Sequence, residues 1–596
     1  MSLAEAARTW WEEASRRRSD RLRWRSSRAL LGAFLLLPAA TAGVRIFRGG
    51  LPSLAYDECE YALQMLETAE LLFRRGLLAW PDIVAWHQQY AKPPLLVDLS
   101  AGVLLLVGQV RVVGALAVTM VVVTALTSIA VFRLVRALFC LRTALLSVTA
   151  VGAIPASGLL ASRFFPEPLV TLLLVLLLGV LFSPHPRAPT TRTLLLAAVV
   201  CAGLLAKSTF PVLAAGPILL RLLDRSESAT AAEMRLSIAS GTVLGIAASA
   251  IWYATNFADA FAYARDAYDW ASREPTSVLD HVRHWASAVA LRALGIGGSV
   301  VALTVVALGV ARLVGRRRAT GDEAVPRDGE GPWSSLDREQ RTFLLALAAA
   351  SLPSIAIALP SPNVSTRLLL PAFSMLAIGA AIALAEARVG VIARSVRVVA
   401  LVLLALQWSA VQVGGLSPVR ASEAPPPLSR AVRALNPYFG PLDRFDIRPL
   451  EALLRATAPL AWSARALGPR QPTIYFVDNH PELDLSRFQL YQSVRRASLP
   501  VGWLCYFEWS PERRAAALKD AREHPSLVVS YRPEGSLRSD LEFLNRHADE
   551  CLRAVRDPAS GFRRVRDFAP PDASYALELY ANFDLPSAPT LALPGS

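Results

Sequence analysis

The chain alternates between long apolar runs and short polar stretches that carry arginine. Runs close to the roughly 20 residues that a helix needs to cross a bilayer recur before residue 416. They predict about eleven transmembrane helices, at 29–47, 111–133, 143–161, 167–183, 191–206, 209–223, 236–255, 288–313, 341–360, 367–386 and 395–414. The pair 191–206 and 209–223 is short enough to form one bent hairpin instead. A shorter run at 95–107 predicts an interfacial or re-entrant helix.

Lysine and arginine in the short loops set the expected orientation, because such residues gather on the cytoplasmic side. Seven arginines lie within residues 16–28, before the first span, and further arginines occur in every second loop after it. We therefore expect a cytoplasmic basic segment at 1–28, a transmembrane domain at 29–415 with a long external loop at 48–110, and an extracytoplasmic domain and tail at 416–596. A cleaved signal peptide within 1–47 is the alternative reading of the N-terminus.

Composition agrees with a membrane protein. Of 596 residues, 53% are hydrophobic and only 18% are charged, and the mean hydropathy is +0.38. The net charge of +14 is explained by loop anchoring and contact with anionic membrane lipids. Nucleic-acid binding is not expected, because the internal side carries no basic soluble module.

The C-terminal region has a different pattern. Short β-branched and aromatic runs predict strands at 472–478, 526–531, 562–568 and 574–583, while 511–524 and 537–555 have helical periodicity. These elements predict a small α/β domain. Cys505 and Cys551 both lie in it, and spacing alone leaves open whether they form a disulfide.

Ionisable residues recur on the expected outer face. Asp57 and Glu58 follow the first span, and the next external loop carries Arg163 and Glu167. Lys207 lies at an external turn, where a lysine near lipid needs an anionic partner or access to water. The third external loop adds His281 and His284.

Carboxylates beside cations at a membrane surface suit a substrate that is both a lipid and an anion. A carboxylate can act as a general base toward a hydroxyl. Lysine and arginine can neutralise a phosphate leaving group. This combination favours sugar transfer from a polyprenyl phosphate.

A set of motifs in 30–415 resembles the GT-C superfamily of glycosyltransferases that use polyprenyl-phosphate-linked sugars. The motif DExxY at Asp57, Glu58 and Tyr61 is followed by KPPL, which begins at Lys92. The segments SRFFPE and AGLLAK, and an arginine before LLLPAF, continue the likeness. Within the superfamily, the sequence is most similar to bacterial relatives of protein O-mannosyltransferases and to the lipid A aminoarabinose transferase.

The resemblance implies a multi-pass enzyme of a bacterial plasma membrane with an extracytoplasmic active site and inversion at the anomeric carbon. It implies catalytic roles for Asp57, Glu58 and Glu167, of which Asp57 activates the acceptor. Residues expected to bind the donor phosphate are Lys92, Arg111, Lys207 and Arg163, and those expected to line the substrate cavity are Tyr61, Tyr90 and Arg367. His281 or His284 is a candidate ligand for a divalent metal, whose presence stays open. The acceptor, whether glycan, lipid or protein, is not indicated.

Two other functions remain as alternatives. A transporter or flippase of lipid-linked substrates would be expected to carry charges near mid-bilayer and repeated broken helices. A non-enzymatic envelope scaffold would use the C-terminal domain for contacts and would tolerate loss of the external acids.

Overall fold

The computed structural model describes most of the chain after the N-terminal segment. The described residues are 29–50, 54, 56–87, 92–107, 112–183, 188–224, 229–271, 277–319, 336–359, 367–387, 391–417, 426–438, 442, 448–465, 472–477, 485–494, 499–504, 511–533, 547–568 and 575–583. The chain divides into two compact units. The first contains Met1–Arg48, Leu71–Val103 and Val113–Leu442, and the second contains Gly49–Glu70, Leu104–Val112 and Asp443–Ser596.

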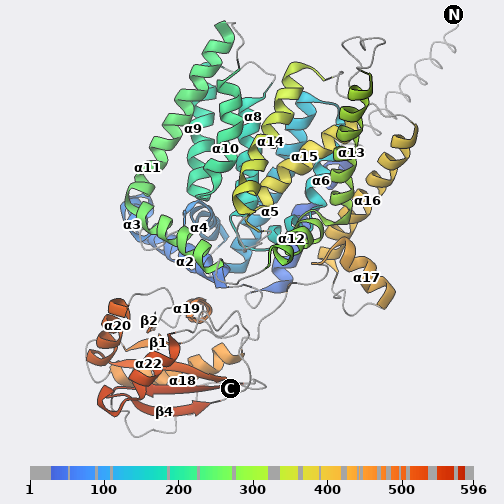
Figure 1. Cartoon of the computed structure of the whole chain (residues 1–596). Helices are drawn as coiled ribbons and strands as arrows, with labels where there is room; N and C mark the ends of the chain where they lie inside the picture. Colours follow the sequence, from blue (N-terminus) through green and yellow to red (C-terminus); the bar gives the residue numbers. More distant parts are fainter. Residues whose placement is uncertain are drawn as a thin grey trace, which may run out of the picture. The chain divides into compact units, whose positions relative to one another are not determined.

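The first unit is helical. Its helices in Figure 1 include α8, α9, α10 and α14, of which α8 contacts both α9 and α10, and α10 contacts α14. A helix over Ala29–Gly49 begins the described chain. The later elements are η2 (Gly76–Ala79), α3 (Trp80–His87), α5 (Val112–Leu138), α6 (Leu141–Gly152), α7 (Pro155–Ala161), α8 (Glu167–Leu181), α9 (Pro189–Ala206), α10 (Phe210–Leu222), α11 (Ala229–Ala271), α12 (Val278–Ser287), η3 (Ala288–Ala293), α13 (Gly295–Ala319), α14 (Arg338–Ala358), α15 (Leu370–Glu386), α16 (Val391–Leu416) and α17 (Pro426–Leu435). Helices α2 (Tyr56–Arg75) and α4 (Leu95–Val107) each have residues in both units.

Each of the eleven predicted spans coincides with a helix or a bent pair of helices. Among the described residues, six single helices are long and apolar enough to cross a membrane, and two bent pairs, α6 with α7 and α12–η3 with α13, also qualify. The predicted spans at 167–183, 209–223 and 367–386 form helices of 15, 13 and 17 residues. The chain is therefore a multi-pass integral membrane protein, while the count of eleven crossings stays a prediction.

The helix breaks have a common polar support. The chain bends by 72° between α6 and α7, and Gly295, with φ 69°, begins α13 after the π-helical turn η3. Gln407 of α16 donates from Nε2 to the carbonyls of Ala153 and Leu294, at 2.7 Å each, and its Oε1 accepts from the Gly297 amide at 2.6 Å. One buried amide thus satisfies backbone groups that both breaks leave without a helical partner.

Several helix ends meet on one face of this unit. Arg221, in the last turn of α10, donates to the carbonyl of Leu181 at the end of α8. Gln340, in the first turn of α14, donates to the carbonyl of Leu138 at the end of α5. Thr143 of α6 donates to Glu386, the last residue of α15. These contacts gather six helix ends on the same face: the ends of α5, α8, α10 and α15 and the starts of α6 and α14. This is the arrangement expected if successive helices cross the membrane in alternating directions.

The second unit contains the predicted C-terminal sheet. Five strands lie in the order β2-β1-β3-β5-β4, with β1 parallel to β2 and β3, and β5 antiparallel to β3 and β4. The strands are β1 (Thr473–Phe476), β2 (Val501–Trp503), β3 (Ser526–Pro533), β4 (Arg563–Phe568) and β5 (Tyr575–Ala581), and the helices are α18 (Arg448–Arg465), α19 (Leu485–Val494), α20 (Pro511–Glu523) and α22 (Ala548–Arg556), followed by the short turn η5 (Pro558–Ser560).

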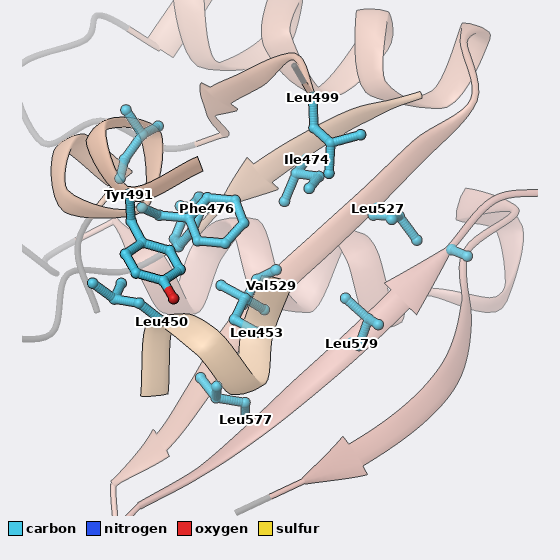
Figure 2. Packing of buried hydrophobic residues seen from close by; sticks show 13 residues of the cluster. Leu450, Leu453, Ile474, Phe476, Tyr491, Leu499, Leu527, Val529, Leu577 and Leu579 are labelled. Carbon is cyan, nitrogen blue, oxygen red and sulfur yellow. The ribbon is translucent and has the colours of Figure 1, made fainter. Parts of the chain in front are cut away.

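Alternation along the strands places a hydrophobic core on each face of this sheet. Ile474, Phe476 and Val529 point to one face, where Figure 2 shows them against Leu453 of α18 and Tyr491 of α19. Tyr475 and Val528 point to the other face and pack with Cys551 and Val555 of α22. Period-two alternation in half-buried strands gives this two-sided arrangement.

Most of the C-terminal predictions agree with the structure. The four predicted strands correspond to β1, β3, β4 and β5, and the helix predicted at 511–524 is α20. Of 537–555, the structure describes only 547–555. Cys551 is disulfide-bonded, while Cys505, its candidate partner, lies outside the described residues.

Candidate active site

Three residues predicted separately meet in one buried ion cluster. Lys207 Nζ lies 2.6 Å from Glu167 Oε1, and Arg367 Nε lies 3.4 Å from the same oxygen. Glu167 is only 1% exposed, whereas the Lys207 and Arg367 side chains are 14% and 32% exposed. The guanidinium of Arg367 also lies over the Phe165 ring, 4.4 Å from its centre. We call these three residues the Glu167 cluster.

Local sequence explains why all three residues lie at helix ends. Pro166 and Pro168 flank Glu167 at the start of α8, where proline is tolerated because the first amides have no helical partner. Lys207 ends α9 in an extended conformation, and its carbonyl accepts from the amide of Phe210, which begins α10. Arg367 lies in the turn before α15, where its carbonyl accepts from the amide of Leu370.

The helices that meet at the Glu167 cluster are short. Helices α8, α10 and α15 begin there and α9 ends there, with 15, 13, 17 and 18 residues respectively. At about 1.5 Å per residue they span roughly 20–27 Å, less than the roughly 30 Å of a bilayer core. The cluster is thus expected to lie recessed within the membrane. Three helix N-termini add partial positive charge there.

The two carboxylate oxygens of Glu167 are in different situations. Oε1 has both cations, whereas Oε2 is buried and has no hydrogen-bond partner among the described residues. A buried carboxylate oxygen without a donor is unfavourable, since burial removes its hydration. A ligand that brings a hydroxyl or a water to Oε2 would relieve this.

A cavity adjoins the first turn of α8. Its lining includes Pro168 and Thr171, which follow Glu167, and Leu370, which follows Arg367. Most of the lining is apolar, but five hydroxyl side chains contribute to it: Thr124, Thr127, Ser128, Ser157 and Thr171. Thr124, Thr127 and Thr171 donate to carbonyls in their own helices, which leaves their oxygens as acceptors.

The DExxY residues lie in the first turns of α2. Asp57 is half-buried in the first turn, Glu58 is fully buried and Tyr61 is 9% exposed. Acidic residues in a first turn are stabilised by the helix dipole. These three residues belong to the second unit, and the Glu167 cluster belongs to the first.

The remaining predicted phosphate ligands are only partly described. Lys92 is 9% exposed, just before α4. Arg163 is half-buried in the turn before α8. Arg111 and Tyr90 lie outside the described residues.

One buried cation near Arg163 was not predicted from the sequence. Arg45 is 3% exposed in the helix Ala29–Gly49, donates to the carbonyls of Gly158 and Tyr438, and interacts with the charge of Arg163. The signal was an arginine within the apolar run of the first span, where ionisable residues usually have a function.

The two candidate metal ligands are only partly described. His281 Nε2 lies 2.7 Å from the carbonyl oxygen of Leu359. Because a carbonyl only accepts, Nε2 donates there, which leaves Nδ1 as the nitrogen able to ligate a metal. Helix α12 contains His284, whose side chain lies outside the described residues. No group of three or more His, Cys, Asp or Glu side chains gathers in the part of the chain that the structure describes.

No protein-family model and no curated protein match the chain. Two crystal structures of ArnT from Cupriavidus metallidurans, one bound to undecaprenyl phosphate and one in the apo state, are 13% identical, with TM-scores of 0.46 and 0.48. They cover 94% and 93% of this chain and 98% of theirs. An oligosaccharyltransferase from Archaeoglobus fulgidus in the apo form is 12% identical, with a TM-score of 0.43, over 84% of this chain and 69% of that one.

These are distant likenesses of fold, and the GT-C resemblance rests on the sequence motifs. The predicted class, a polytopic helical membrane protein with a small C-terminal sheet, agrees with the fold.

Proposed function

We propose that the protein is an integral-membrane glycosyltransferase that moves a sugar from a polyprenyl-phosphate donor to an extracytoplasmic acceptor hydroxyl. The Glu167 cluster is the observation that carries this proposal. It places two cations around one buried carboxylate at the ends of short apolar helices. An amphiphile with an anionic head and an apolar body suits this combination.

In the proposed reaction, Lys207 and Arg367 bind the donor's phosphate, and the resemblance implies Lys92, Arg111 and Arg163 as further phosphate ligands. The acceptor oxygen attacks the anomeric carbon, and a new C–O bond forms as the bond to the phosphate oxygen breaks. Asp57 takes the hydroxyl proton, with Glu58 beside it in the sequence. The sugar joins the acceptor with inversion, and polyprenyl phosphate leaves with the bonding electrons. The assignment of Asp57 rests on the DExxY resemblance alone.

Asp57 can be tested by an isosteric change. Asp57→Asn keeps size and hydrogen bonding but cannot take a proton, so transfer from a labelled polyprenyl-phosphate sugar should fall by at least about 10²-fold. Donor binding should remain. Glu60→Gln is the matched control, because Glu60 is half-buried in the same helix outside the motif. Equal turnover in the two variants would remove Asp57 from the role of base.

The same labelled-donor assay separates the alternatives. A transporter would move the donor across vesicles without forming a new glycosidic bond, and a scaffold would do neither. Neither alternative requires Asp57 to be ionised.

We also propose that the N-terminus is cytoplasmic and the sheet unit extracytoplasmic in a bacterial plasma membrane. The alternating arginine-rich loops support this orientation. The disulfide at Cys551 supports it as well, since disulfides persist in oxidising compartments.

Cysteine labelling in intact cells tests the orientation. The free thiols Cys59, Cys140 and Cys201 are first replaced by serine, and Cys505 and Cys551 are kept. A maleimide that cannot cross the membrane should then label Lys519→Cys on the exposed side of α20, but Thr191→Cys at the start of α9 only after permeabilisation. The reverse pattern would invert the topology.

A further inference from the structure

The Glu167 cluster holds two cations against one carboxylate. Lys207 and Arg367 both lie against Oε1 of Glu167, which is 1% exposed. The carboxylate therefore offsets part of the positive charge that these two side chains would offer to a phosphate. Arg163, in the turn before α8, is the nearest further cation in the sequence and lies in the same unit.

The proposed reaction changes the charge of the phosphate. A sugar joined to a polyprenyl phosphate makes a phosphodiester with one negative charge. Loss of the sugar leaves a monoester, whose second pKa is about 6 and which is therefore mostly dianionic at neutral pH. The buried carboxylate of Glu167 repels a bound phosphate in proportion to the charge of that phosphate, so it disfavours the monoester more than the diester.

Resting on the proposed function, we propose that Glu167 is a specificity-determining residue that selects the singly charged donor and disfavours the doubly charged product. Its carboxylate holds Lys207 and Arg367 in place and offsets part of their positive charge. Without Glu167, the donor diester and the product monoester would both bind more tightly, and the affinity for the monoester would rise more. The carboxylate thereby promotes release of the product after transfer.

The test compares two soluble prenyl probes that differ in one charge. Binding of farnesyl phosphate and of its methyl ester to the detergent-purified full chain is measured by calorimetry at pH 8 and pH 5. Coulomb energy is proportional to ligand charge. If Glu167→Gln raises the affinity for the diester by about tenfold at pH 8, it should raise that for the monoester by about a hundredfold. At pH 5 the monoester carries one charge, and the two gains should become equal.

Two controls keep the result interpretable. Glu167→Asp retains the charge and should keep the wild-type ratio of monoester to diester affinity. The diester has no titrating proton near these pH values, so any pH dependence of its binding reports protein groups alone. A thermal melt of each variant verifies folding.

The outcomes separate the inference from the proposed function. Equal gains for the two probes at pH 8, or no gain for either, would overturn the charge selection while leaving a phosphate site. If neither probe binds the wild-type chain, or if Lys207→Met weakens neither, the phosphate site of the proposed function fails as well.

Discussion

Two ion clusters lie at opposite ends of the same helices and differ in how their carboxylates are satisfied. Helices α8 and α10 both begin at the Glu167 cluster, and Arg221 joins their other ends. Arg221 donates to both oxygens of Glu339, to the carbonyl of Leu181, and lies 4.1 Å above the Phe182 ring. Glu167, in contrast, has both cations on one oxygen and no donor for the other among the described residues.

The difference indicates that the Arg221–Glu339 pair stabilises the fold and that the Glu167 cluster binds a ligand. A bidentate pair with its remaining donor satisfied has little left to offer a substrate. A buried carboxylate with an unsatisfied oxygen, beside incompletely buried cations, is unfavourable for stability unless a ligand completes it. We therefore expect changes at Arg221 to affect stability and changes in the Glu167 cluster to affect binding.

The largest expected effect is on stability, at Arg221. Arg221→Met leaves the carbonyl of buried Leu181 without its donor and removes the charge-assisted bonds to Glu339, which is 42% exposed and regains water. Together these losses should lower the free energy of unfolding by about 3 kcal/mol. Phosphate binding by the folded fraction should be unchanged. The measurements are thermal or denaturant unfolding in detergent and binding of the farnesyl probes.

Arg338→Met is the matched control. Arg338 pairs with Asp224 in the same region, but its side chain is 69% exposed, and an exposed pair contributes at most about 1 kcal/mol. Equal losses from the two variants would show that Arg221 is not the stabilising element of this face.

The next effect is on binding, at Lys207. Lys207→Met removes a charge-assisted contact of roughly 1.5–3 kcal/mol, so affinity for the methyl ester of farnesyl phosphate should fall by about ten- to a hundredfold. Stability should change less than in Arg221→Met, because Arg367 still compensates Glu167. Lys519→Met, on an exposed helix of the sheet unit, controls for loss of one positive charge. Unchanged affinity would make Lys207 an anchor at the end of α9.

The sequence predicted the helices better than their ends and breaks. Each apolar run in the sequence coincides with a helix or a bent pair of helices. The agreement follows because a chain in lipid must satisfy its backbone groups by continuous helical hydrogen bonding. The bend at Ile154 and the π-helical turn at 288–293 were not predicted. Both depend on Gln407, more than 110 residues away along the chain from Leu294 and further from Ala153. Periodicity carries no information on such a long-range contact.

The candidate site was predicted as separate residues and not as a cluster. Glu167, Lys207 and Arg367 were each marked by an unfavourable or motif-linked position in the sequence. Their shared oxygen could not be predicted, because the pairing of Glu167 with Lys207 joins residues 40 apart on two helices. Arg45 was missed because only its burial, which the sequence does not show, distinguishes it from an anchoring arginine.

The smallest effect concerns a third carboxylate, in the sheet unit, which like Glu339 has cationic partners on both oxygens, although its Oε1 accepts no hydrogen bond among the described residues. Glu578 of β5 is 2% exposed, accepts from the Tyr580 hydroxyl at 2.6 Å, and pairs with Arg556 at 2.5 Å and with Arg564 at 3.2 Å. Burial alone would raise the pKa of Glu578, but the hydrogen bonds and the two arginine charges together lower it below its ordinary value.

A carboxylate whose folded pKa is lowered stabilises the protein above its unfolded pKa of about 4.3. That stabilisation is lost as pH falls through the folded value. Hydrogen exchange of the β5 amides in the full chain should therefore speed up as pH falls from about 5 to 3, relative to Glu578→Gln, in which exchange is fast throughout after correction for intrinsic rates. Glu523→Gln, at an exposed pair with Lys519, should follow the wild type. If Glu578→Gln also follows the wild type at every pH, the Glu578 network does not stabilise the sheet, and cations on both oxygens would not distinguish a structural carboxylate from Glu167.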